Sequence, residues 1–146
     1  MTSSAASVIA ALQNALAAEQ AASYGYGIVG AHLSGARQAE ATTDWIAHMR
    51  ARDALTAMIS ARGAQPVPAS VAYQLPAPVS SAAQAEALAA TLEDGVARAY
   101  LGLVALTEVA LRAFGALQVR AAALRAENWQ GFTVAFPGLP PQNLRG

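Results

Sequence analysis

Apolar residues recur at intervals of three and four along four separate stretches of the chain, which is the period of a helix that buries one face. The stretches span about residues 3–33, 36–62, 81–105 and 108–128. We therefore expect an all-α protein with four helices in one domain that covers residues 1–146. A chain of this length can bury a working core without disulfides or metals.

Short breaks separate the helices within each pair. Ser34 and Gly35 end the first helix, and Thr107 with Glu108 marks the start of the fourth. Helices joined by such short connections return beside each other, so the pattern predicts two antiparallel hairpins.

The connection between the hairpins, residues 63–79, contains four prolines and cannot be helical. Extended chain covers up to roughly 3.3 Å per residue, so this segment can run the roughly 40 Å length of the bundle. Such a crossover would make the second and third helices parallel, as in four-helix folds with one long crossover. The alternative is a loose surface loop between antiparallel helices.

An extended tail is expected over residues 131–146, which include three prolines. Phe132, Val134 and Phe136 alternate along it, so one edge of the tail can fill an apolar groove. The groove can belong to the same bundle or, through swapping in a homodimer, to a second copy.

Five polar residues fall on or beside the apolar stripes of the four helices: Glu19, His48, Arg52, Glu93 and Arg120. With a crossover, pairing the helices about their turns brings all five to one height. Polar side chains in a core are costly unless they are paired or bind a metal. We therefore expect a polar core layer that is a metal site, the remains of one, or an ion-pair network.

The stripe assigned to the fourth helix consists of Val109, Ala113, Leu117, Arg120 and Leu124. A register error, in which some of the five layer residues simply face solvent, is a further alternative.

The charge and composition of the chain exclude some classes of function. Nine basic and nine acidic residues give a net charge of zero, so no global field attracts nucleic acid or an anionic membrane. With no cysteine, the chain has neither disulfides nor thiolate metal ligands. We expect no secretion signal, because residues 1–11 lack a basic stretch and a strongly apolar run. We also expect no membrane-spanning segment, because no apolar run approaches the roughly 20 residues that cross a bilayer. We expect a soluble, cytoplasmic protein.

Three phrases resemble a ferritin-like family of unknown function: residues 24–27 (Tyr-Gly-Tyr-Gly), 50–53 (Arg-Ala-Arg-Asp) and 135–140 (Ala-Phe-Pro-Gly-Leu-Pro). The resemblance covers nearly the whole chain and implies membership of the ferritin-like superfamily. That superfamily implies a crossed bundle that often holds two metals. Their ligands are one glutamate on each of the first and third helices and Glu-x-x-His on each of the other two.

Only part of the superfamily's metal-ligand set is present in this sequence. Glu19, His48 and Glu93 fit, whereas Trp45 stands where the second helix should supply glutamate, and Arg120 takes the layer position on a fourth helix without histidine. Two glutamates and one imidazole cannot neutralise two iron ions, and guanidinium groups would repel them further.

Two interpretations of the layer remain. In the first, Glu19 and Glu93 pair with Arg52 and Arg120, no cofactor is bound, and the protein is a non-catalytic structural or interaction module whose protein partner the sequence does not identify. In the second, Glu19, His48 and Glu93 hold a single divalent iron, manganese or zinc ion in a mononuclear metal-binding or oxidase-like protein.

Overall fold

The computed structural model describes residues 2–139 and contains four long helices. They are α1 (Ala5–Ala31), α2 (Gly35–Ala61), α3 (Ala82–Val104) and α4 (Val109–Gln130). The expectation of an all-α four-helix bundle is confirmed, with helix ends that differ from the predicted ones by a few residues.

Local capping explains where several helices begin and end. The Ser4 hydroxyl accepts a hydrogen bond of 3.1 Å from the backbone N–H of Ser7, and Ser81 caps α3 through Gln84 in the same way. Such caps satisfy N–H groups that have no partner inside the helix. The α4 helix ends at Gly131, whose φ of 81° suits a residue without a Cβ.

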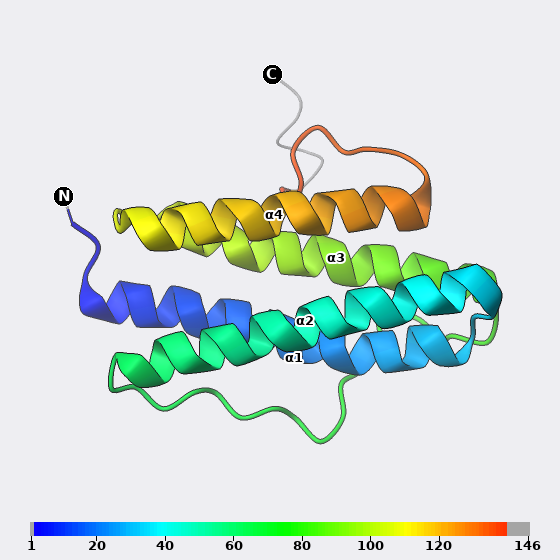
Figure 1. Ribbon diagram of the computed structural model, residues 1–146, viewed down its shortest axis with the longest axis horizontal. Coiled ribbons are helices and arrows are strands. Elements are labelled where there is room, and N and C mark those ends of the chain that lie inside the picture. Colours follow the sequence, from blue (N-terminus) through cyan, green and yellow to red (C-terminus); the bar gives the residue numbers. More distant parts are fainter. Residues whose placement is uncertain (1, 140–146) are drawn as a thin grey trace.

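The proline-rich segment is a crossover. It returns along α1 to the end of the bundle at which α2 begins, so α2 and α3 run parallel (Figure 1). The Gln13 side chain fixes its start by donating to the Gln65 carbonyl at 2.7 Å and accepting from the Val67 N–H at 2.8 Å. Farther along, the Tyr24 and Tyr73 ring centroids lie 5.4 Å apart. The loose-loop alternative is wrong.

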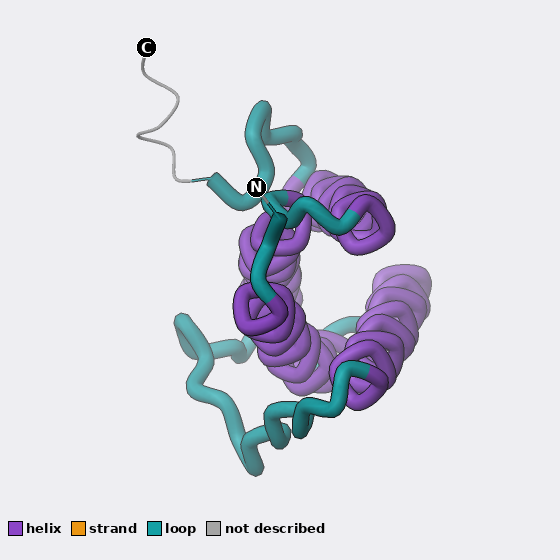
Figure 2. The backbone as a smooth tube through the Cα atoms, turned by 90° about the vertical axis from the view of Figure 1, so that its left-hand side faces the viewer, coloured by secondary structure: helices purple, strands orange, loops and turns teal. Residues whose placement is uncertain are grey.

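The helices form an open arc rather than a closed square. The α1 helix packs against α2 and α3, and α3 packs against α4. Viewed along the bundle, α2 and α4 form the two ends of this arc (Figure 2). Side chains still connect them, because Asn128 of α4 donates to Glu40 and Trp129 donates to Asp44.

The buried face of α4 differs from the predicted stripe. Its buried residues are Leu111, Gly115, Ala122 and Trp129. By contrast, three apolar residues of the predicted stripe are exposed: Val109 at 67%, Leu117 at 62% and Leu124 at 53%. A Cβ placed on Gly115 would lie 2.8 Å from Leu103 Cβ, so the two helices approach closely here. The buried face includes small residues at the closest contact with α3, and the exposed face also carries leucines, which explains why the apolar stripe was misleading.

After α4 the chain folds back over α3 and α4 (Figures 1 and 2). A Cβ on Gly138 would come within 2.8 Å of the Arg98 backbone nitrogen, so the tail contacts α3 of its own bundle. Phe132, Val134 and Phe136 nevertheless remain 61%, 44% and 54% exposed. The prediction that they fill a groove of this bundle is therefore largely wrong. The remainder of the expected tail, residues 140–146, lies outside the described residues.

None of the described helices combines the length and the apolar character that crossing a membrane requires.

Candidate functional site

Three of the five predicted layer residues meet in the centre of the bundle. Glu19 of α1, His48 of α2 and Glu93 of α3 are all 0% exposed. The His48 ring lies between the two carboxylates, with Nδ1 2.6 Å from Glu19 Oε2 and Nε2 2.8 Å from Glu93 Oε1. Each ring nitrogen therefore has one carboxylate as its partner.

The arginine of this site is Arg125 of α4, which the sequence analysis did not identify. Its Nε donates to Glu93 Oε1 at 2.9 Å, and its side chain is 17% exposed. Arg52 instead pairs with Asp53 near the surface, and Arg120 is exposed on α4. The prediction that Arg52 and Arg120 belong to the core layer is therefore wrong. We call Glu19, His48, Glu93 and Arg125 the ion-pair cluster.

Two tyrosines donate further hydrogen bonds to the carboxylates. The Tyr26 hydroxyl donates to Glu93 Oε1 at 2.5 Å, and the Tyr100 hydroxyl donates to Glu19 Oε1 at 2.7 Å. Glu93 Oε1 thus accepts from three donors, which compensates for the loss of hydration on burial.

A third buried carboxylate, Asp44, lies beside the cluster one turn before His48 on α2. Its Oδ2 accepts from Trp129 Nε1 at 2.9 Å, while the Tyr26 hydroxyl lies 3.4 Å away. Burial raises the pKa of Asp44, and the hydrogen bond from Trp129 opposes that rise. Asp44 therefore ties the end of α4 to α2.

The charges of the cluster stabilise one another. Burial by itself would lower the pKa of His48, but Glu19 and Glu93 outweigh it and raise that pKa to about 9. Burial would raise the pKa of Glu93, but His48 and Arg125 together lower it. The imidazolium and guanidinium therefore face the two carboxylates, and these opposite charges stabilise one another.

The tyrosine hydroxyls act as hydrogen-bond donors and not as acids. Burial, followed by the charge of Glu93, raises the pKa of Tyr26, and burial with Glu19 does the same for Tyr100. Both groups are therefore neutral across the physiological pH range.

A dinuclear metal centre does not fit this donor set. Both His48 nitrogens already contact carboxylates on opposite sides of the ring, and the Arg125 guanidinium occupies the α4 side of Glu93. Trp45, at the position of the missing glutamate, is partly exposed and donates to the Ser23 carbonyl. Within residues 2–139, no group of three His, Asp or Glu side chains is arranged to hold a metal ion.

The sequence contains signals for some of the site residues that were not predicted to belong to the core layer. Asp44 lies four residues before His48, which places both on one face of α2. Arg125 lies three residues after Ala122 and four before Trp129, so it shares their face of α4. Nothing in the residue pattern singled out the hydroxyls of Tyr26 and Tyr100.

The comparisons with known proteins agree with this fold. The chain is similar to the crystal structure of a conserved hypothetical protein, rv2844, from Mycobacterium tuberculosis, with a TM-score of 0.85 and 36% identity, covering 88% of this chain and 98% of that one. The comparison with curated proteins finds no match. Residues 11–141 match the family described as Domain of unknown function (DUF4439). The chain therefore belongs to the DUF4439 family.

Proposed function

We propose that this protein is a non-catalytic bundle of ferritin-like type, in which an ion-pair cluster takes the place of a metal centre. Its role would be that of a structural or interaction module. The observation that carries the proposal is the position of His48, whose two nitrogens each contact a different carboxylate.

Three features support the ferritin-like assignment. The crossover makes α2 and α3 parallel, which is the connectivity of ferritin-like bundles (Figure 1). Glu19, His48 and Glu93 lie on the first, second and third helices, as metal ligands do in that superfamily, and all three are buried at one level. The substitution of a guanidinium for the fourth-helix ligand distinguishes this chain.

Exposed apolar side chains support the interaction role. Leu117 and Leu124, two turns apart on α4, are 62% and 53% exposed, and Phe132 and Phe136 of the tail are similarly uncovered. Leu117 and Leu124 share one face of α4, and apolar residues that adjoin on one exposed face are typical of contact surfaces.

Metal analysis tests the proposal. We expect protein expressed in medium supplemented with iron, manganese and zinc, and purified without chelators, to contain far less than one equivalent of any of them. The physical reason is that binding through His48 would require breaking an ion pair between buried groups. Elemental mass spectrometry provides the measurement.

The chain offers a matched control, because His32 is its second histidine and lies exposed at the end of α1. One equivalent of metal that His48→Ala abolishes and His32→Ala retains would establish the mononuclear alternative and refute the proposal.

A further inference from the structure

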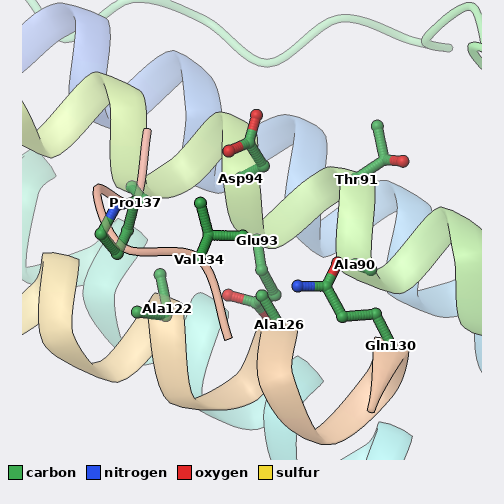
Figure 3. A pocket seen from close by; sticks show the side chains of 11 residues that line it. Ala90, Thr91, Glu93, Asp94, Ala122, Ala126, Gln130, Val134 and Pro137 are labelled. Atoms are coloured by element: carbon green, nitrogen blue, oxygen red, sulfur yellow. The ribbon is translucent and has the colours of Figure 1, made fainter. Parts of the chain in front are cut away.

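A pocket of about 270 Å³ lies between α3 and α4. Val134 and Pro137 of the tail cover one side of it, and Gln130 lies at its edge (Figure 3). Much of its wall consists of methyl groups, from Ala90, Ala97, Ala122, Ala123 and Ala126. The volume equals roughly nine water molecules, which suits a small ligand.

Glu93 provides the one fully buried carboxylate among the residues that line this pocket. Its side chain extends from α3 toward α4 beside Ala126 (Figure 3). Its Oε1 accepts from Tyr26, His48 and Arg125, but its Oε2 is buried and has no hydrogen-bond partner in residues 2–139. An unpaired oxygen of a buried carboxylate is costly, so a donor in the pocket would be stabilising.

The chemistry of the pocket defines that donor. An ionised carboxylate only accepts hydrogen bonds, so the ligand must present N–H or O–H. The charged residues that line the pocket are Glu93 and Asp94, and within the described chain no basic residue lines it. Asp94 is exposed and pairs with Arg98, so the buried acceptor is Glu93. A cationic donor is therefore favoured, because its hydrogen bond to Oε2 would be charge-assisted.

We propose that this pocket binds a small primary ammonium compound with a short aliphatic body, whose nitrogen donates to Glu93 Oε2 while its carbons contact the alanine methyl groups. This site goes beyond the structural role proposed above, and it requires no metal. The outcome of the binding test therefore does not depend on the outcome of the metal analysis.

Nuclear magnetic resonance titration of the whole protein with n-butylammonium chloride tests the site. We expect a saturable change in the backbone amide signals of the pocket-lining residues, with millimolar affinity. Two probes of similar shape serve as controls, n-butanol and sodium butyrate. Loss of the charge-assisted hydrogen bond should weaken n-butanol binding at least ~10-fold, and repulsion should exclude butyrate.

Two substitutions on one helix locate the site. Ala126→Leu places a larger apolar side chain in the pocket and should weaken n-butylammonium binding at least ~10-fold, because that side chain takes the volume of the ligand. Ala116→Leu makes the same change on an exposed part of α4 and should leave the affinity unchanged. Glu93→Gln should remove the preference for n-butylammonium over n-butanol.

Three outcomes would each overturn the proposal. The first is the absence of saturable binding of n-butylammonium, which would mean that the pocket holds water only. The second is equal affinity for n-butylammonium and n-butanol. The third is unchanged n-butylammonium binding in a folded Ala126→Leu variant.

Discussion

Replacing Arg125 with methionine should lower the free energy of unfolding by about 3 kcal/mol. Methionine keeps much of the volume of the side chain but leaves Glu93 without its guanidinium partner. The cost is high because Glu93 is fully buried and Arg125 is only 17% exposed, so water cannot replace the lost interaction. Denaturant unfolding at neutral pH, followed by circular dichroism, measures the change.

Arg120→Met provides a control on the same helix. Arg120 is exposed and lies outside the ion-pair cluster, so its replacement should change the free energy of unfolding by less than about 0.5 kcal/mol. Equal effects of the two substitutions would show that Arg125 has no special role in the core.

Raising the pH should destabilise the protein through His48. The folded state raises the pKa of His48 from 6.5 to about 9. The cation is thus bound more tightly in the folded state than in the unfolded state. Its contribution is complete below pH 6.5 and disappears as the pH rises through about 9. The shift corresponds to about 3 kcal/mol, a large part of the stability of an ordinary domain.

Unfolding measured at a series of pH values checks this expectation. The chain has two histidines, and the other, His32, is exposed. His32→Ala should therefore retain the loss of stability between about pH 6.5 and 9, whereas His48→Gln should be less stable at pH 6 and nearly independent of pH in this window. A wild-type protein with constant stability across the window would show that His48 is not a buried cation.

At acidic pH the effect is the opposite, because lowering the pH should destabilise the protein through Glu93. His48 and Arg125 lower the pKa of Glu93 below its usual 4.5, so its contribution is present above that value and is lost as the pH falls. Together the two groups place the pH of greatest stability between the ordinary pKa values of glutamate and histidine.

The sequence allowed most of the fold to be predicted. Helical periodicity, the glycines at helix ends and the proline-rich crossover are local signals, and they indicated four helices with α2 parallel to α3. Glu19, His48 and Glu93 could be placed in one layer because each lies on or beside the apolar stripe that α1, α2 or α3 buries.

The fourth helix could not be predicted as well, because both of its faces carry apolar residues. Its exposed side includes Leu117 and Leu124, whereas close contact with α3 requires Gly115 on the buried side. Choosing the stripe with Leu117 and Leu124 rotated the helix and exchanged Arg125 for Arg120. Tertiary packing, and not helix periodicity, selects the arginine.

The contacts of the tail and the hydrogen-bond partners of the tyrosines could not be predicted, for related reasons. Alternating apolar residues indicate an extended segment but do not identify what covers it, and Phe132 and Phe136 stay exposed. Tyr26 and Tyr100 were recognisable as core residues, but their hydroxyl partners lie on another helix. Such partners depend on the relative rotation of two helices.

The central claim is that His48 is an imidazolium held between two carboxylates. Nitrogen-15 nuclear magnetic resonance of the histidine ring tests it most directly, because the chemical shifts report whether each nitrogen carries a proton. We predict that both His48 nitrogens are protonated at neutral pH and that one proton is lost only near pH 9. A His48 ring with one unprotonated nitrogen at neutral pH would contradict the account.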